Sequence, residues 1–294
     1  MSASAPARDA SLTADASALT KACHLLYDPA PHIHADRFAL PLLSPRMQAI
    51  ARDPAQAEQY FRVRLAGLEP LVGETLARHA FAEAHADAAY GRGIRQHVLV
   101  GAGLDSYALR RAGEPADLRF FEIDHPASQA VKRDRLAAIG RADAPIEFVP
   151  VDFERDTLDA GLRRSRFDPA RPAFFAWLGV VVYLSPEATR QTLAAIAAVA
   201  APGSEVTFDF FQPPEILREE DARSLRLSDA FGRERGEPNI GYHRREEMIA
   251  IAAGLGYEVA ELLPGTQVTA RHVPAHLSRY AIHDGVQMIL LRRP

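Results

Sequence analysis

Glycine and acidic residues follow three successive apolar segments at spacings that suit a nucleoside-containing ligand. Gly101 and Gly103 come directly after the apolar residues 98–100. Glycine at such a turn lets the backbone bend sharply and lets a ligand lie against the main chain. Asp124 ends the next apolar segment, where an acidic group can accept hydrogen bonds from both ribose hydroxyls. Asp152 ends the third segment and suits the exocyclic amine of adenine.

These signals also have other interpretations. A glycine pair can simply make a tight strand-to-helix turn, and an acidic residue at a strand end often caps the next helix. Three successive strand ends with ligand-type residues nevertheless favour binding. Ser106 stands where the dinucleotide motif G-x-G-x-x-G has its third glycine. This difference disfavours a nicotinamide dinucleotide and leaves open an adenosyl ligand without phosphates. Glu122 would share a strand face with Asp124, but Asp124 is nearer the strand end and is preferred.

The elements that must position these residues alternate between strand-like and helix-like segments. This alternation predicts βαβ units and an α/β fold around a parallel sheet covered on both faces. The predicted strands cover residues 97–100, 119–123, 146–151, 173–178, 205–211, 258–262 and 287–291. The predicted helices cover residues 106–112, 127–139, 158–164, 186–200 and 244–255.

The chain divides into an N-terminal arm and one domain. We expect the Ala- and Ser-rich residues 1–20 to be mobile, and residues 21–294 to form a single domain. Its parts are a helical N-terminal cover (21–93), a cofactor-binding half (94–212), a polar lid or insertion (213–243) and a C-terminal helix with strands (244–294). In the cover, Asp53 and Pro54 predict a helix start. Apolar residues then follow at helical spacing, and we expect one continuous apolar face: Phe61, Leu65, Leu68, Val72 and Leu76.

The composition excludes several classes of function. The 294 residues are 48% hydrophobic and 24% charged, as in soluble globular proteins. With 34 basic and 38 acidic residues, no basic excess favours nucleic acid as a partner. The single cysteine, Cys23, excludes a disulfide framework and fits the cytoplasm. The longest apolar run, residues 173–184, is too short to span a membrane. His32 and His34 have no third ligand nearby, so we expect no metal site.

Four segments together resemble one known family. They are VLVGAGLDSYALRR, FFEIDHP with Lys132 downstream, FVPVDFE, and FDPARPAFFAWLGVVVYLSPEA. The chain resembles the leucine carboxyl methyltransferase family, and more narrowly a bacterial branch of its S-adenosyl-L-methionine-dependent O-methyltransferases. The resemblance is densest over residues 62–184. It implies a class I methyltransferase (Rossmann-like) fold of seven strands, the last pair reversed, with a helical N-terminal cover.

The resemblance also implies roles for individual residues. The glycine loop would pack under the methionine part of the cofactor, one or two acids would hold the ribose, and the next strand end would hold the adenine. These groups are, in that order, Gly101 and Gly103; Asp124 with Glu122; and Asp152 with Phe153.

A basic residue of the N-terminal helices would pair with the cofactor carboxylate in the family. The pair Arg62 and Arg64 fits this role. Residues two apart on a helix point about 200° apart, so one of them can face the site, and we choose Arg64. Many relatives have Glu at the end of the fourth strand, where this chain has Leu178. We count this position among the cofactor contacts, and the change leaves the type of acceptor open.

Methyl transfer to oxygen is an in-line displacement in which the enzyme holds the reacting atoms in line. A carboxylate acceptor needs no base, whereas a hydroxyl acceptor can need one. Tyr183 could line the acceptor site and His243 could be the base, although both residue types are also common in cores. We expect a small-molecule acceptor. A NAD(P)-dependent oxidoreductase and a non-catalytic S-adenosyl-L-methionine-binding module are the alternatives. The acceptor's identity and the oligomeric state stay open.

Overall fold

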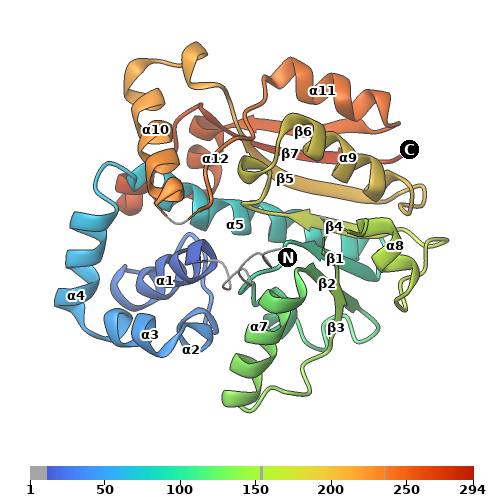
Figure 1. The fold of residues 1–294 in the computed structure, drawn as a ribbon, viewed down its shortest axis with the longest axis horizontal. Helices are drawn as coiled ribbons and strands as arrows, with labels where there is room; N and C mark the ends of the chain where they lie inside the picture. Colours follow the sequence, from blue (N-terminus) through green and yellow to red (C-terminus); the bar gives the residue numbers. More distant parts are fainter. Residues whose placement is uncertain (1–11, 153–154, 235) are drawn as a thin grey trace, which may run out of the picture.

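A seven-stranded sheet runs through the centre of the molecule (Figure 1). The structure is a computed structural model and describes residues 12–152, 155–234 and 236–294. The strand order is β3-β2-β1-β4-β5-β7-β6. The strands are β1 (Gln96–Val100), β2 (Arg119–Asp124), β3 (Ile146–Pro150), β4 (Phe174–Trp177), β5 (Glu205–Phe211), β6 (Glu258–Pro264) and β7 (Val286–Arg292). Strands β1 to β5 are parallel, whereas β7 runs antiparallel to both β5 and β6.

This topology confirms the predicted seven-stranded α/β fold, in which the last two strands stand in reverse order in the sheet and β7 is the antiparallel strand. Each predicted strand is present, with ends within two residues of the prediction. The apolar runs were informative because β1, β4 and β5 are buried along their whole length. A strand with both faces covered has no polar alternation, so it appears in the sequence as a continuous apolar run.

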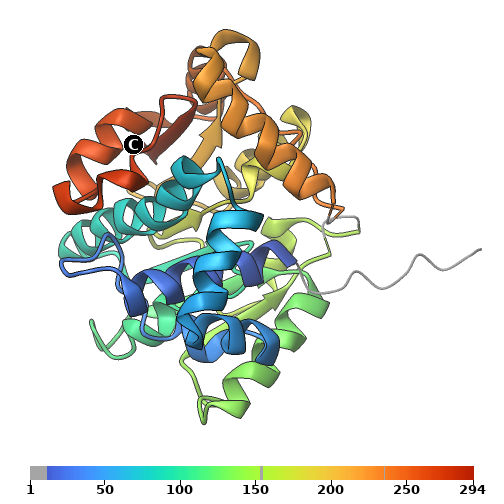
Figure 2. The same ribbon diagram turned by 90° about the vertical axis from the view of Figure 1, so that its left-hand side faces the viewer.

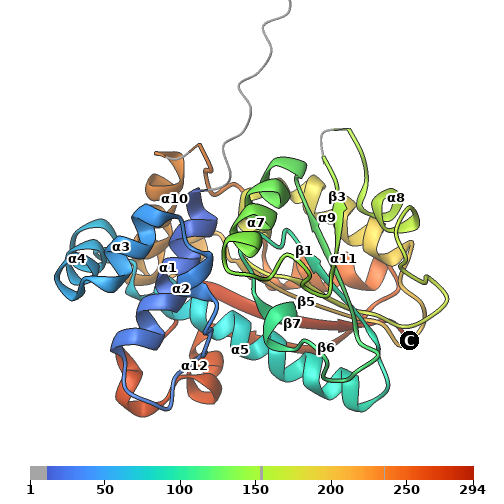
Figure 3. The same ribbon diagram turned by 90° about the horizontal axis from the view of Figure 1, so that it is seen from below.

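Helices cover both faces of the sheet. One face packs against α8 (Leu158–Arg163), α9 (Pro186–Ala197) and α11 (Arg245–Gly254). The other face packs against α5 (Glu69–Gly91), α6 (Tyr107–Arg110) and α7 (Pro126–Ala138). Figure 3 shows the long α5 crossing the sheet on this second face. Residues of β1 alternate between the two layers, because Val98 packs on the α9 side and Leu99 on the α5 side.

The N-terminal helices form a group at one end of the sheet, which faces the viewer in Figure 2. They are α1 (Leu12–Tyr27), α2 (Ala39–Leu42), α3 (Pro45–Arg52), α4 (Pro54–Gln59) and the π-helix η1 (Tyr60–Arg64). The predicted mobile arm, residues 1–20, was therefore too long, since residues 12–20 belong to α1. Leu19 is fully buried and packs with Ala22 and Leu43. The Ala- and Ser-rich composition concealed this small apolar face. Residues 1–11 lie outside the described part.

The continuous helical face predicted after Pro54 was wrong in one respect. Asp53 does cap α4, since its side chain accepts hydrogen bonds from two backbone N–H groups of the first turn, and Pro54 opens the helix. The chain then turns at Gly67, whose φ is +79°, before α5 begins. Leu65, Leu68 and Val72 still share one apolar cluster. The spacing therefore predicted the packing but not the break in the helix.

The remaining elements lie mostly toward the C-terminus. They are the 3₁₀-helices η2 (Val181–Tyr183), η3 (Pro214–Ile216) and η4 (Ala275–Tyr280), and the helices α10 (Glu219–Arg233) and α12 (Gly265–His272). Helix α10 occupies the segment predicted as a lid or insertion, and its Leu225 is fully buried in a cluster with Leu76 of α5. Among the residues the structure describes, no helix has both the length and the apolar character needed to cross a membrane.

Close packing of α5 against η4 requires a glycine at position 73. A Cβ added to Gly73 would lie 2.0 Å from the carbonyl oxygen of Tyr280, whereas one on Gly91 would have no neighbour within 4 Å. We expect Gly73→Ala to lower the free energy of unfolding by about 1–3 kcal/mol, as overpacking does. Gly91→Ala, in the same helix, should leave it unchanged or slightly raised. Urea denaturation measures both, and equal stability of the two variants would contradict this packing.

Candidate functional site

The turn after β1 adopts a conformation that requires glycine. The φ angles of Gly101 and Gly103 are +67° and +47°. A Cβ on Gly101 would lie 2.6 Å from Cγ2 of Val180, and one on Gly103 would lie 3.4 Å from Cβ of Ala14. The N–H of Gly101 donates to the carbonyl oxygen of Ile123 at 2.8 Å, which ties the loop to β2. The two glycines thus let Val180 and Ala14 approach the main chain closely at the carboxyl ends of the strands.

Asp124 lies directly beside this glycine loop. Its Oδ2 accepts a hydrogen bond from the N–H of Gly103 at 2.6 Å, and its Oδ1 accepts one from the N–H of His125 at 2.7 Å. The residue is only partly buried. A carboxylate has about four acceptor positions, so two backbone bonds leave capacity for ligand hydroxyls. The structure therefore brings Asp124 and the glycine pair together, as the sequence suggested.

Glu122 points toward the same face of β2 but lies deeper. It is 1% exposed, and its Oε2 lies 2.6 Å from Nζ of Lys132. Lys132 also donates to the carbonyl oxygen of Asp105 at 2.6 Å, just after the glycine loop. Burial raises the pKa of Glu122 to about 7, although Lys132 opposes the shift. This geometry makes Glu122 a buried support beneath the glycine loop. Of the two acids, Asp124 is the one that lies nearer to solvent, at the end of β2.

Asp152 occupies the neighbouring strand end. The N–H of Val151 donates to the carbonyl oxygen of Asp124 at 3.0 Å, so the ends of β2 and β3 are adjacent. Asp152 is half-buried, and its carboxylate lies 3.6 Å from Nε of the exposed Arg155. Phe153, the other predicted adenine contact, lies outside the described residues.

The basic residue that reaches the strand ends is Arg78 of α5, which the sequence analysis did not single out. Arg64, like Arg62, is exposed at the end of η1. Arg78 is mostly buried, and its Nη1 donates to Oε1 of Glu74 at 3.0 Å. A Cβ on Gly179, directly after Leu178, would lie 2.4 Å from this guanidinium. Because Val180 in turn contacts Gly101, the guanidinium and the glycine loop border the same region.

A second carboxyl group approaches Arg78 from β5. Oδ1 of Asp209 accepts a hydrogen bond from the N–H of Gly179 at 2.7 Å, and its Oδ2 lies 4.0 Å from Nη1 of Arg78. Burial raises the pKa of Glu74 to about 7, with a smaller contribution from the charge of Asp209. Burial also raises the pKa of Asp209, while Arg78 opposes the shift. We refer to Glu74, Arg78 and Asp209 as the carboxyl–arginine cluster.

The other predicted site residues have different environments. Leu178 packs among the apolar residues between the sheet and α5 and adjoins a very small cavity. Tyr183 is half-buried. Burial would lower the pKa of Arg78, but Glu74, Asp209 and, to a smaller extent, Tyr183 raise it. His243 is 1% exposed, and its Nε2 lies 3.3 Å from Oγ1 of Thr189 in α9. It is therefore a packed residue on the α9 side of the sheet, away from the α5 side that holds Arg78.

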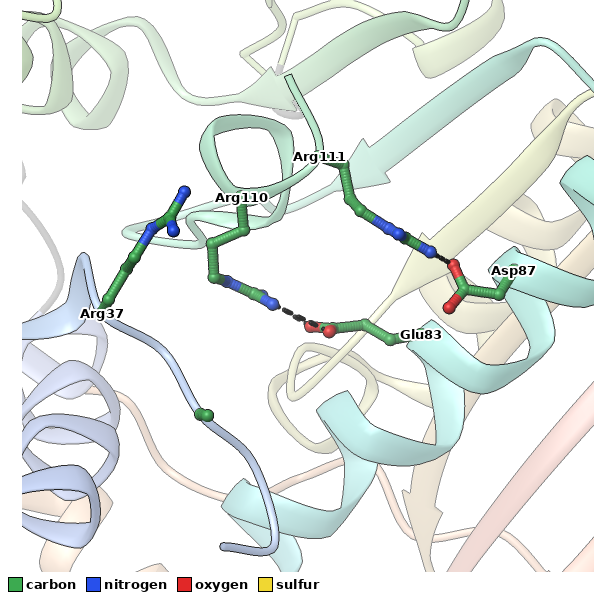
Figure 4. Close-up of a pocket in the computed structure, with 6 residues that line it drawn as sticks. Arg37, Glu83, Asp87, Arg110 and Arg111 are labelled. Atoms are coloured by element: carbon green, nitrogen blue, oxygen red, sulfur yellow. Dashed lines mark hydrogen bonds and ion pairs between the residues drawn. The ribbon is translucent and has the colours of Figure 1, made fainter. Parts of the chain in front are cut away.

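An open surface cavity of about 340 Å³ lies beside α6, apart from the glycine loop (Figure 4). It is lined by Ala35, Arg37, Glu83, Asp87, Arg110 and Arg111. Arg110 pairs with Glu83 at 2.6 Å, and Arg111 pairs with Asp87. These ion pairs neutralise most of the charge that lines the cavity, and its residues are not those of the strand ends.

Comparison with known proteins identifies the family. The family described as Leucine carboxyl methyltransferase matches residues 14–197, more than half of the sequence. The chain belongs to this family. A relative from Mycobacterium sp. (strain JLS), provisionally named an S-adenosyl-L-methionine-dependent methyltransferase, is 34% identical over 213 residues, covering 70% of this chain and 68% of the relative. A protein of the same name from Mycobacterium bovis (strain BCG / Pasteur 1173P2) is 32% identical, covering 67% of this chain and 60% of that protein.

Solved structures support the same fold. A provisionally named methyltransferase from Thermobifida fusca YX aligns with a TM-score of 0.57 over 98% of this chain and 96% of its own, at 18% identity. A provisionally named sarcosine dimethylglycine methyltransferase from Galdieria sulphuraria aligns with a TM-score of 0.50 over 76% of this chain and 88% of its own, at 10% identity. This member of the leucine carboxyl methyltransferase family is thus an S-adenosyl-L-methionine-dependent methyltransferase with the class I fold.

The buried pair of Glu122 and Lys132 should be essential for stability. Lys132→Met leaves Glu122 buried without its cation, and we expect the free energy of unfolding to fall by about 3–5 kcal/mol. Arg190→Met breaks the exposed pair of Arg190 and Glu187 and should change the free energy of unfolding little. Chemical denaturation at neutral pH compares the two variants. A loss no larger in Lys132→Met than in Arg190→Met would contradict the supporting role of the buried pair.

Proposed function

We propose that this methyltransferase transfers the methyl group to an oxygen atom, of a carboxylate or a hydroxyl, in a small-molecule acceptor. The name of the family points to a carboxyl acceptor. The observation that favours a small acceptor is the position of α1, since Ala14 lies against Gly103 and Ser17 lies 3.5 Å from Nη2 of Arg78. An acceptor must reach the strand ends beneath this cover, which restricts its size.

The strand ends fit the cofactor of the family. The glycine pair offers main chain that a larger residue would cover, which suits the methionine part of S-adenosyl-L-methionine. Asp124 offers acceptors for the ribose hydroxyls beside that loop. Asp152 is at the adjacent strand end, in reach of an adenine, with Phe153 following in sequence. Arg78 supplies a mostly buried guanidinium for the carboxylate, a role for which its burial suits it better than the exposed Arg64.

The protein's contribution to methyl transfer is mainly orientation. When bound, S-adenosyl-L-methionine supplies a methyl group on a positively charged sulfur, which leaves readily. The residues at the strand ends would hold the cofactor, and the cover formed by α1 would hold the acceptor and exclude water. A carboxylate acceptor is ionised at neutral pH and needs no base. Tyr183 is half-buried in η2, shortly after the end of β4, and is the candidate to line the acceptor's path, whereas His243 is buried in the α9 layer.

Membership of the family favours methyl transfer over hydride transfer by an oxidoreductase. The sequence also suggested a non-catalytic cofactor-binding protein, because Leu178 replaces the acid of many relatives. Methyl consumption with small carboxylic acids and phenols separates these two, measured as S-adenosylhomocysteine formed. Cofactor binding without turnover on every acceptor would favour the binding protein.

The ribose assignment predicts the effect of a conservative change at Asp124. Asp124→Asn keeps an acceptor for the N–H of Gly103 but removes the charge. Hydrogen bonds to a charged group contribute about 1.5–3 kcal/mol, so we expect affinity for S-adenosylhomocysteine to fall roughly 10- to 100-fold. Calorimetric titration measures this, with Asp143→Asn on the exposed turn before β3 as the matched control. Unchanged affinity in Asp124→Asn would remove Asp124 from the site.

The two candidate arginines predict different outcomes. Arg78→Lys keeps the charge but loses the fork geometry, and we expect at least a tenfold loss of affinity for S-adenosylhomocysteine. Arg64→Ala should bind within about twofold of the parent, because Arg64 is exposed. The same titration tests both. A larger loss of affinity in Arg64→Ala than in Arg78→Lys would instead assign the contact with the cofactor carboxylate to Arg64.

A further inference from the structure

The carboxyl–arginine cluster contains more negative than positive charge. Glu74 and Asp209 are each 2% exposed, and they reach Arg78 from different elements, α5 and β5. Glu74 is held by both of its oxygens, at 3.0 and 3.2 Å from Nη1 of Arg78. Asp209 also accepts a hydrogen bond from the N–H of Gly179. Two buried acids thus share one buried cation at the end of β4.

Three hydroxyl side chains in the described part of the chain interact with the cluster. Ser17 of α1 accepts a hydrogen bond from Nη2 of Arg78 at 3.5 Å, the hydroxyl of Thr75 donates to Oε2 of Glu74 at 3.5 Å, and Tyr183 of η2 interacts electrostatically with Arg78. All three are hydroxyl groups, so none of them supplies a second positive charge. With both acids ionised, the cluster carries a net charge of −1. A buried excess charge is costly, so a proton is retained near neutral pH, in agreement with the raised pKa values of both acids.

On the basis of the proposed function, we propose that Glu74 and Asp209 receive the α-ammonium group of the cofactor's methionine, while Arg78 receives its carboxylate. The cluster would then be a subsite for an amino-acid zwitterion. The three groups flank Gly179, next to Leu178, where many relatives have an acid. This chain has an apolar residue at that position and places its acids on β5 and α5 instead.

Charge balance explains why the cluster suits this cofactor. The amino-acid end of S-adenosyl-L-methionine is neutral as a whole, and its sulfonium adds one positive charge. A cluster of net charge −1 is therefore neutralised when the cofactor is bound. The ammonium takes the place of the shared proton, which passes to solvent, and no covalent bond changes. Binding should accordingly release protons and weaken as the pH falls below about 7, the pKa of Glu74.

The test is calorimetric titration of the whole protein at pH 7 in phosphate and in Tris, two buffers with different ionisation enthalpies. We expect S-adenosyl-L-methionine, added without an acceptor, to bind with proton release and to lose affinity by up to about tenfold per pH unit below 7. We expect 5′-methylthioadenosine, which lacks the amino-acid group, to bind without release and without this pH dependence. This comparison needs no variant, so it does not depend on whether a variant folds.

Two near-isosteric variants locate the effect. Glu74→Gln and Asp209→Asn should each lower affinity for S-adenosyl-L-methionine at least tenfold and reduce the proton release, while affinity for 5′-methylthioadenosine is unchanged. Glu205→Gln is the matched control, because Glu205 is a buried acid on the same strand as Asp209 but is paired with two arginines of its own, Arg92 and Arg292. Its proton release should persist.

Three results would overturn the assignment. The first is equal pH dependence for the two nucleosides. The second is proton release that survives unchanged in both Glu74→Gln and Asp209→Asn. The third is failure of the parent protein to bind either nucleoside, which would overturn the cofactor site as a whole and so is distinguishable from failure of the cluster alone.

Discussion

Charges buried between the sheet and α5 must be paired, and their pairing fixes the glycine loop. Lys132 joins Glu122 to the carbonyl oxygen of Asp105, and Asp105 lies 3.3 Å from Nε2 of His79. The hydrogen bond from His79 and the charge of Lys21 outweigh burial and hold the pKa of Asp105 well below its usual range. Since an unpaired buried charge costs several kcal/mol, each partner is constrained in place. These contacts hold the glycine loop in its left-handed turns, which glycine adopts without steric cost.

The same pairing couples the N-terminal cover to the loop. Lys21 of α1 lies 3.0 Å from Oδ2 of Asp36, and Oγ of Ser106 donates to Oδ1 of the same residue at 2.5 Å. Arg110 approaches Asp36 at 3.6 Å and also pairs with Glu83 of α5. The residues that follow the glycine loop are thereby attached to α1 and α5 at once. A substitution in the N-terminal cover can therefore alter the cofactor site through these ion pairs as well as through apolar packing.

The sequence alone was informative where one local property decides the structure. Buried strands appear as apolar runs, and a left-handed turn requires glycine at Gly101 and Gly103. Depth is not local. Glu122 and Asp124 are two residues apart and share a face, yet one lies below the loop and the other beside it, because strand residues two apart differ by about 7 Å along the strand.

Arg78 was missed for a related reason. Its i,i+4 pairing with Glu74 looks in sequence like an exposed helical ion pair, and the alanines of α5 give the buried side little apolar contrast. Only the tertiary fold, which brings Asp209 and Gly179 against this helix, distinguishes it from a surface pair. The break at Gly67 was equally invisible, since Leu65 and Val72 keep their helical spacing across it and still pack together.

Two buried acids with a pKa raised to about 7 lie near the glycine loop, and they differ in what neutralises them. Glu122 has a cation of its own in Lys132, 2.6 Å away, so its charge is balanced within the chain. Glu74 must share Arg78 with Asp209, so that cluster stays one positive charge short. A balanced pair gains nothing from an external cation, whereas an unbalanced one does. Burial alone therefore does not distinguish an acid that supports the fold from one that binds a ligand. The net charge of the acid together with its neighbours makes the distinction.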